Sequence, residues 1–312
     1  MSLALDLNGI DAAYGPVQAL FALNLPVAEG KVTAVLGPNG AGKTTSLRVA
    51  AGLLPPRNGT VSLRGSDMTG RAPREIARSG LCLIPEGRGT FPSLTVRENL
   101  LLQCSIARKK MSQVEEIAYG RFPVLGQRRS QIAGTLSGGE QHMLALSRAL
   151  TTDPQVILID EISMGLAPII VERLFDSVAE IAAEGRTIVL VEQLAELVLE
   201  IADFAAVISK GTVATIGQPG DIKDALEEIY LGADVRTEAG ARVTDGTRAW
   251  KTPTGTLAHR GDCPVVVRRH DVRPVAADDE LLECAICGEL SDMSSELSQM
   301  STEQNGSEGV NS

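Results

Sequence analysis

Gly37-Pro38-Asn39-Gly40-Ala41-Gly42-Lys43-Thr44-Thr45 is the stretch that decides the fold of this chain, because it matches the phosphate-binding pattern G-x-x-x-x-G-K-[ST]. A short apolar, β-branched run at 32–36 precedes it, and a helical pattern over 44–51 follows and ends at Gly52. Glycines let successive N–H groups point at phosphate oxygens, and the helix N-terminus behind them adds its positive dipole end. A glycine-rich turn that fits by chance is the alternative, and the strand–loop–helix order disfavours it.

The chemistry of this loop follows from its last residues. Lys43 is expected to reach the β- and γ-phosphates, and the Thr44 hydroxyl is expected to bind Mg²⁺. The loop therefore predicts a nucleoside triphosphate with its metal.

Composition excludes several other classes of protein. The chain has 312 residues, is 44% hydrophobic, and carries a net charge of −10 with a pI of about 5.0. This length allows one large or two modest domains with a full core. No run of 18 apolar residues occurs and the N-terminus lacks a secretory signal, so we expect a cytoplasmic protein. The acidic balance gives no basic surface for nucleic acid or anionic lipid, so any role at a membrane must depend on a protein partner.

Strand and helix patterns alternate along the chain, which predicts an α/β fold with a largely parallel core sheet. Strands are expected at 3–14, 19–27, 32–36, 60–63, 81–84, 156–161, 187–192, 205–209 and 212–217, the last two forming a hairpin at Lys210-Gly211. Helices are expected at 44–51, 73–78, 95–102, 113–122, 169–183, 194–202 and 221–230, with Thr95 and Ser112 as N-caps of the third and fourth.

A helical insert over about 86–140 interrupts this alternation and ends in a second anion-binding sequence. The sequence Leu136-Ser137-Gly138-Gly139-Glu140-Gln141 opens a long amphipathic helix with Met143 and Leu144 among its apolar positions. Glycines at a helix N-terminus leave its N–H groups open to an anion. Alone this is a weak signal, but an acidic strand follows it.

That strand, at 156–161, is apolar and ends in Asp160 and Glu161. Ligands of α/β sheets gather at the carboxyl ends of the strands, so Asp160 is expected to hold Mg²⁺ and Glu161 to act as the base for the attacking water. Tyr14, at the end of the first strand, is positioned to stack on a purine; the alternative is that it covers the core.

These motifs together resemble the ATP-binding cassette (ABC) subunits of ABC transporters over residues 3–232. Tyr14 falls at the adenine-stacking position, 37–45 at the Walker A loop, 136–141 at the LSGGEQ signature, and 156–161 at Walker B with its catalytic glutamate. Residues 163–167 resemble the D-loop, with Met164 where leucine is usual. The sequences at 84–88 and 191–193 look like one of the two ATPases of the branched-chain amino acid importers.

The resemblance implies a P-loop ABC ATPase core over 1–232, with a mainly parallel sheet, an N-terminal antiparallel β subdomain, a helical signature subdomain and a small C-terminal tail. It implies ATP and Mg²⁺ as ligands. The nucleotide-binding residues it implies are Tyr14, Gly37, Pro38, Asn39, Gly40, Ala41, Gly42, Lys43, Thr44, Thr45, Ser137, Gly138, Gly139 and Glu140; the magnesium set is Thr44, Glu86 and Asp160; and the catalytic set is Glu161, Gln193 and Lys43.

Two positions depart from the general ABC pattern. Glu86 replaces the Q-loop glutamine, and Gln193 replaces the switch histidine. Glu86 can still ligate Mg²⁺ or hold the attacking water, although its charge near the γ-phosphate needs the metal. Gln193 can donate a hydrogen bond to the γ-phosphate but cannot become cationic or relay a proton, so hydrolysis is expected to be slow unless a partner cassette supplies histidine.

The resemblance also implies partners. Each ATP is expected to lie between Walker A of one cassette and Ser137-Gly138-Gly139 of another, in a heterodimer or a homodimer. Transmembrane permeases and, indirectly, a substrate-binding protein are the further partners, which places the chain at the cytoplasmic face of the membrane. The alternatives are a soluble ABC ATPase without a transport role and a catalytically weak regulatory cassette; one acidic cassette with all five catalytic positions filled disfavours both.

The residues after the cassette are expected to form a linker at 233–256, a small unit at 257–290 and a disordered tail at 291–312. His259 and Cys263, followed twenty residues later by Cys284 and Cys287, have the spacing of a tetrahedral Zn²⁺ site, with His270 as a substitute ligand. An iron–sulfur centre, free thiols or a redox disulfide are the alternatives. The other two cysteines, Cys82 and Cys104, are expected to be small buried residues.

Overall fold

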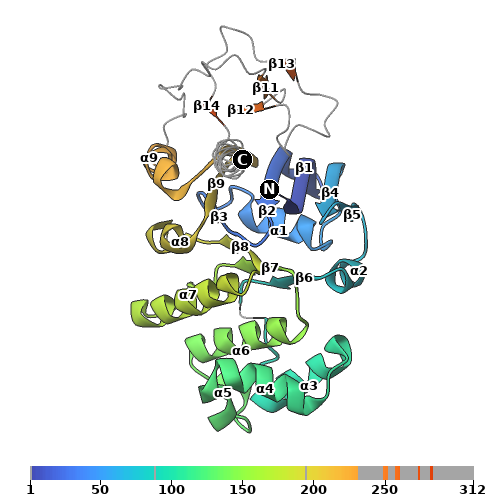
Figure 1. Ribbon diagram of the computed structural model, residues 1–312, viewed down its shortest axis with the longest axis vertical. Coiled ribbons are helices and arrows are strands. Elements are labelled where there is room, and N and C mark those ends of the chain that lie inside the picture. The colour runs from blue at the N-terminus through green and yellow to red at the C-terminus, as the bar shows by residue number, and fades with distance from the viewer. Residues whose placement is uncertain are drawn as a thin grey trace, which may run out of the picture.

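The computed structural model describes residues 2–87, 89–193 and 195–230, together with four short strands at 249–251, 257–260, 273–274 and 282–283. Its core is the expected α/β arrangement of a mostly parallel sheet with a smaller antiparallel sheet (Figure 1).

The central sheet contains six strands in the order β10-β9-β3-β8-β7-β6. Their bounds are β3 (Val32–Leu36), β6 (Leu81–Ile84), β7 (Val156–Asp160), β8 (Thr187–Val191), β9 (Phe204–Ser209) and β10 (Thr212–Gly217). All neighbours pair in parallel except β9 and β10, which form the expected antiparallel hairpin. The parallel strands therefore present their carboxyl ends at one edge of the sheet, where ligands of such sheets bind.

The two faces of this sheet are buried in two different cores. In β3, Ala34 and Leu36 belong to one core and Val35 to the other, as expected when successive side chains of a strand point to opposite faces. The same alternation separates Ile157 from Leu158 in β7. Strands buried on both faces read as continuous apolar runs, which is why their positions were predictable.

The antiparallel sheet covers one face. It has the order β2-β1-β4-β5, with β1 (Leu3–Tyr14), β2 (Val17–Ala28), β4 (Asn58–Leu63) and β5 (Ser66–Asp67). Two helices, α1 (Lys43–Ala50) and α2 (Pro73–Arg78), contribute residues to the same core. The short β5 was not predicted, because two exposed polar residues carry no strand pattern.

Helices cover the opposite face. They include α6 (Gly138–Thr151), α7 (Pro168–Ala183), α8 (Ala195–Ile201) and α9 (Pro219–Tyr230). Figure 1 shows α6 and α7 on one side of the central sheet and α1 on the other.

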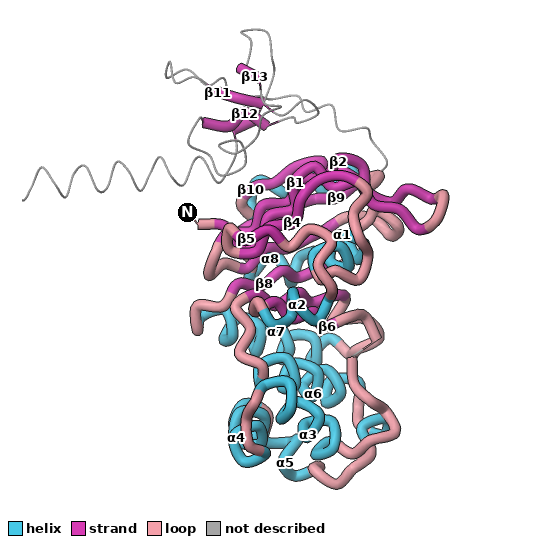
Figure 2. Tube along the Cα trace, turned by 90° about the vertical axis from the view of Figure 1, so that its right-hand side faces the viewer, coloured by secondary structure: helices cyan, strands magenta, loops and turns pink. Residues whose placement is uncertain are grey.

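The helical insert comprises α3 (Val96–Ala107), α4 (Met111–Arg121), α5 (Pro123–Gln127) and the 3₁₀ turn η1 (Ala133–Thr135). In both views it packs beyond α6, at the end of the molecule away from the antiparallel sheet (Figures 1 and 2). Thr95 caps α3 as predicted, because its hydroxyl accepts the Glu98 N–H at 3.1 Å.

The prediction that Ser112 caps the next helix is wrong. Lys110 is the N-cap of α4, and its N–H donates to the Gln113 side chain at 2.9 Å. A glutamine three residues into the helix therefore does the capping, and Ser112 lies inside the first turn. The helix α5 was also missed, since Pro123 and Gly126 read as a loop.

Cys82 and Cys104 are half-buried and pack against the helix-side core, close to the expected small-residue role. Burial raises the pKa of the Cys82 thiol to about 11, so it stays protonated at neutral pH. Among the described helices, none has the length and apolar content that crossing a bilayer requires.

Beyond the cassette, the structure describes a four-stranded sheet in the order β13-β11-β12-β14. Its strands are β11 (Ala249–Lys251), β12 (Leu257–Arg260), β13 (Arg273–Pro274) and β14 (Leu282–Glu283). The strand β11 lies within the segment expected to be a linker. The strand-like sequence 265–267 and the segment 291–312 lie outside the described residues.

Candidate functional site

The phosphate loop connects β3 to α1 and can only be built with glycine at two points. At Gly37, which has φ 141°, a Cβ would lie 2.0 Å from the Ile208 carbonyl oxygen. At Gly42, which has φ 112°, it would lie 2.7 Å from the Leu20 side chain. Positive φ values and close backbone packing both require glycine, so the loop is held against β2 and β9.

Lys43 begins α1 and turns back over this loop. Its side chain is 4% exposed, and its Nζ donates to the carbonyl oxygens of Gly37 at 2.8 Å and Pro38 at 3.2 Å. Burial lowers the pKa of Lys43, and the negative charges of Glu161, Asp160 and Glu192 oppose that shift. A buried ammonium among carboxylates, with only carbonyls as hydrogen-bond partners here, is suited to bind an anionic phosphate.

Thr44 and Asp160 lie together, as the sequence predicted. The Thr44 hydroxyl donates to Asp160 Oδ1 at 3.1 Å, which joins the start of α1 to the end of β7. Burial raises the pKa of Asp160 to about 6, against the Thr44 hydrogen bond that lowers it, and the charges of Glu161 and Glu86 raise it further. A carboxylate that is costly to ionise alone is one that a divalent cation stabilises, so these two residues fit a magnesium site.

Glu86 is exposed in the loop that follows β6, and its charge reaches Asp160. This proximity is consistent with its predicted role beside the metal. Among the residues that the structure describes, no group of three or more His, Cys, Asp or Glu side chains could hold a metal ion. Such a sparse protein ligand set suits Mg²⁺, which takes most of its ligands from phosphates and water.

Glu161 and Gln193 come from neighbouring strand ends and contact each other. The Gln193 side-chain amide donates to Glu161 Oε1 at 3.1 Å. Glu161 adopts a left-handed backbone conformation with φ 48°, and its N–H donates to the Val191 carbonyl at 2.9 Å. Non-glycine residues in this region are strained and gather at functional sites. The structure thus brings the predicted base and the predicted switch residue together.

Glu192 is a residue of this site to which sequence reasoning gave no role. It is 1% exposed, and its carboxylate accepts the Ser163 N–H at 2.8 Å and the Ser163 hydroxyl at 2.6 Å. Burial raises its pKa, and hydrogen bonds from Ser163 and Gln193 act in the opposite direction. An acid directly after a buried strand was the available signal, the same one that identified Asp160.

Tyr14 stands at the end of β1 with 42% of its surface exposed, and Arg48 of α1 donates to its hydroxyl at 3.2 Å. The exposed ring is free to stack on a base, so stacking stays a prediction and core covering is disfavoured.

The signature sequence forms the N-terminus of α6. Ser137 caps the helix, and the Glu140 carboxylate accepts the Ser137 N–H at 2.9 Å and pairs with Arg128 at 2.9 Å. A Cβ on Gly139 would lie 2.3 Å from the Ile170 side chain, so glycine allows α6 to pack closely on α7. Because the Glu140 carboxylate is engaged in this cap, it shapes the turn.

The structure does not unite this turn with the phosphate loop. The helix α1 packs in the core on one face of the central sheet and α6 in the core on the other (Figure 1). Two anion-binding turns on one chain therefore serve different positions.

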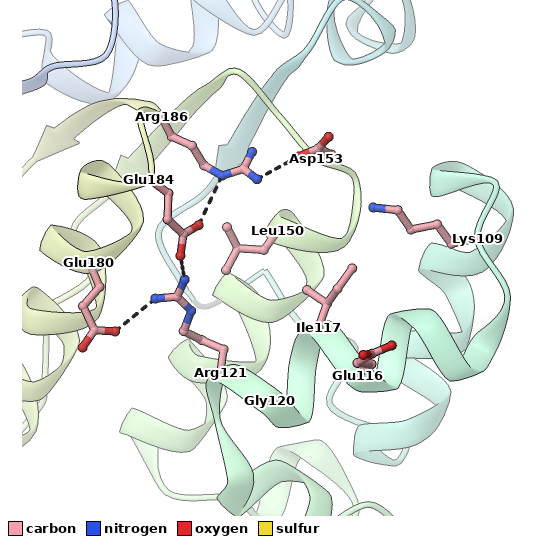
Figure 3. Close-up of a pocket in the computed structure, with 10 residues that line it drawn as sticks. All are labelled: Lys109, Glu116, Ile117, Gly120, Arg121, Leu150, Asp153, Glu180, Glu184 and Arg186. Carbon is pink, nitrogen blue, oxygen red and sulfur yellow. Dashed lines mark hydrogen bonds and ion pairs between the residues drawn. The ribbon is translucent and has the colours of Figure 1, made fainter.

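A pocket of about 510 Å³ between α4, α6 and α7 contains none of the predicted site residues (Figure 3). Its charged groups pair with one another: Arg121 with Glu180 and Glu184, and Arg186 with Asp153. This ion-pair network connects the helical insert to the core and is not the nucleotide site.

The parallel sheet, the Lys43 loop and the Thr44–Asp160 pair define a P-loop nucleoside triphosphatase. Comparisons with known proteins narrow this class. The family model described as ABC transporter matches residues 20–163. The high-affinity branched-chain amino acid transport ATP-binding protein BraG of Pseudomonas aeruginosa is 39% identical over 210 residues, covering 67% of this chain and 90% of that protein.

Two further similarities agree. The probable branched-chain amino acid transport ATP-binding protein LivF of Archaeoglobus fulgidus is 33% identical over 227 residues, covering 72% of this chain and 96% of that protein. The crystal structure of an ATP-binding cassette of an ABC transporter in its ADP conformation superposes with a TM-score of 0.66 at 28% identity, covering 74% of this chain and 99% of that one. The chain belongs to the ATP-binding subunits of ABC transporters and is an ATPase.

Proposed function

We propose that this chain is the ATP-hydrolysing subunit of an importer for branched-chain or related amino acids. The observation that carries the proposal is the 39% identity to BraG across 90% of that protein, whose name specifies branched-chain amino acid transport. The similarity to LivF supports the same substrate class. A soluble ABC ATPase and a regulatory cassette are not favoured by these relatives.

The site supports a specific division of roles in hydrolysis. Thr44 and Asp160 hold Mg²⁺, with Glu86 beside them, and the metal offsets charge on the β- and γ-phosphates. Glu161 accepts the proton of the attacking water, and Gln193 orients that water and the base through its 3.1 Å contact with Glu161. Lys43 stabilises negative charge on the γ-phosphate.

A second cassette completes the site. Since α6 and α1 lie on opposite faces of one sheet, Ser137, Gly138 and Gly139 would bind the nucleotide held by the partner's phosphate loop. Met164 and Ile169, each 56% exposed, flank the loop before α7 and supply apolar surface for that contact. A heterodimer with a histidine-bearing cassette fits Gln193 best, and a homodimer is the alternative.

The permease docks, in this proposal, on the helical insert. Leu102 and Ile106 are four residues apart on α3 and are 42% and 67% exposed, and Phe91 in the preceding loop is 47% exposed. Arg148 of α6 lies 4.9 Å from the centre of the Phe91 ring and hydrogen-bonds to Gly89, so this loop is tied to the signature helix. Such docking would hold the chain at the cytoplasmic face of the membrane and deliver movement to the permease.

Zinc binding after the cassette stays a separate proposal. β12 and β14 pair in parallel with Ala258 opposite Glu283, the residues that directly precede His259 and Cys284 in the chain. Cys263, Cys284, Cys287 and the substitute ligand His270 lie outside the described residues. Metal analysis of untagged protein purified without chelator should find about one zinc per chain, lost on Cys284→Ser; a low content unchanged by that substitution removes the site.

Transport is tested by reconstitution with the permeases and binding protein encoded beside this chain. ATP-dependent uptake of labelled leucine into vesicles, abolished by Lys43→Ala, is the expected result. ATP hydrolysis with no uptake of leucine, isoleucine, valine or related amides would overturn the substrate class. Hydrolysis without any binding to permeases would favour the soluble alternative.

A further inference from the structure

The buried carboxylate of Glu192 has no part in the hydrolysis described above. It follows β8 directly, and its N–H contacts the Val35 carbonyl of β3 at 3.4 Å. An ionised carboxylate with 1% exposure is costly unless its oxygens are hydrogen-bonded. The residues that satisfy it therefore indicate what it holds in place.

All of the hydrogen bonds found for this carboxylate come from two short segments beside the base. One oxygen accepts the Ser163 N–H at 2.8 Å, and the other accepts the Ser163 hydroxyl at 2.6 Å and the Gln193 N–H at 3.3 Å. Ser163 lies two residues after Glu161, in the loop that carries the exposed Met164. Glu192 thus joins the loop after β7 to the loop after β8.

These contacts close a ring around the catalytic pair. Glu161 is connected to Ser163 through the chain, Ser163 to Glu192 by two hydrogen bonds, Glu192 to Gln193 through the chain, and Gln193 back to Glu161 by its amide at 3.1 Å. A closed ring of short covalent and hydrogen-bonded links restricts each member more than an open chain does. The left-handed conformation of Glu161 is held inside this ring.

We propose that Glu192 is a positioning residue for hydrolysis, which couples the Ser163 loop to Gln193 and so aligns Gln193 with Glu161. Its contacts are with protein groups rather than with the phosphate loop's ligand face, so it acts on the chemical step and not on ATP binding. Because the Ser163 loop also carries the apolar Met164 surface, the link would report contact with a second cassette to the base. The proposal depends on ATP hydrolysis alone and not on the transported substrate.

Glu192→Gln is the sharpest test, because it preserves size but turns one acceptor into a donor facing the Ser163 and Gln193 N–H groups. Single-turnover hydrolysis with the full chain in excess over MgATP should slow by about tenfold or more, while ATP affinity stays within about twofold. Ser163→Ala removes one of the two Ser163 bonds and should slow hydrolysis by only a few-fold. It also serves as the second variant if Glu192→Gln fails to fold.

Coupling separates positioning from a purely structural role. In a Gln193→Ala background, Glu192→Gln should have little further effect on the hydrolysis rate, since the residue it positions is gone. Thr187→Val, at the other end of β8, is the matched control: it removes a buried hydrogen bond to the Gly30 N–H and should lower the melting temperature without changing single-turnover hydrolysis. A Glu192→Gln rate within twofold of the parent, or a full additive loss in the Gln193→Ala background, would overturn the proposal.

Discussion

The carboxyl ends of β7 and β8 lie side by side, and each is followed by a buried acid and a polar residue with a different task. Asp160 pairs with Val191 across the two parallel strands, which places Asp160-Glu161 next to Glu192-Gln193. Asp160 accepts one hydrogen bond, from the Thr44 hydroxyl, whereas Glu192 accepts three from backbone and side-chain donors.

This difference indicates how the site divides its acids. Burial raises the pKa of both carboxylates, but only that of Asp160 reaches about 6, with the charges of Glu161 and Glu86 adding to the effect. The end of β7 is therefore left under-satisfied by protein and suited to a cation. The end of β8 is satisfied by protein and suited to hold geometry.

Glu161→Gln should give the largest effect on this pair of strand ends. Glutamine still accepts the Gln193 amide hydrogen bond through its side-chain oxygen but cannot take a proton from water. Steady-state hydrolysis by the full chain is expected to fall by about 10² to 10⁴-fold, as for loss of a general base. ATP should still bind and hold a closed dimer, detectable by size-exclusion chromatography with MgATP. Hydrolysis at the parental rate would show that Glu161 is not the base.

Asp160→Asn tests whether the end of β7 is strained without its metal. The raised pKa means that the folded state binds the Asp160 proton more tightly than the unfolded state does, so this residue costs stability as pH rises through about 6. In EDTA at pH 7.5 the variant should unfold with a free energy higher by up to about 3 kcal/mol, at about 1.4 kcal/mol per pKa unit, and by roughly half that at pH 5.

The control for Asp160→Asn is Mg²⁺ dependence. The stabilised variant should lose magnesium-dependent ATP hydrolysis, because asparagine offers the cation no charge. Equal urea unfolding of parent and variant at pH 7.5 without metal would contradict the strain.

The sequence was sufficient for the strand ends that carry motifs and insufficient for the bonds between them. Buried parallel strands read as unbroken apolar runs, so β3, β7 and β8 and the acids that follow them were predicted from residues alone. The Thr44–Asp160 contact, between residues 116 positions apart, followed from a known pairing of motifs. Glu192 has no such pattern, since its partner Ser163 is set by the register of β7 against β8. Local rules failed in the helical insert for a similar reason: Lys110 rather than Ser112 begins α4 because the Gln113 side chain is within reach.

Gln193→His sharpens the role of the end of β8. An imidazole can become cationic beside the γ-phosphate, whereas the glutamine amide can only donate a hydrogen bond. The full chain assayed alone should hydrolyse ATP slowly, and the histidine variant should be faster by roughly fivefold to tenfold, or about 1 to 1.4 kcal/mol. Gln193→Ala is the matched control and should be slower than the parent. A parental homodimer that is already fast, and unchanged by histidine, would remove the need for a partner cassette.

Glu86→Gln should give the smallest effect and tests the charge crowding at the end of β7. Glu86 is exposed, so its influence on Asp160 is screened by solvent and should be small. Removing its charge lowers the pKa of Asp160 slightly, which should raise the melting temperature of the metal-free protein at pH 7.5 by about one or two degrees, for a few tenths of a kcal/mol. The Mg²⁺ concentration for half-maximal hydrolysis should rise by a few-fold if Glu86 contributes to the metal, and low salt should enlarge the stability change. Glu75→Gln, an exposed acid in α2 that begins on the other face of the sheet, is the control and should change neither quantity. An identical magnesium dependence in Glu86→Gln and the parent would leave Thr44 and Asp160 as the protein's whole contribution to the metal.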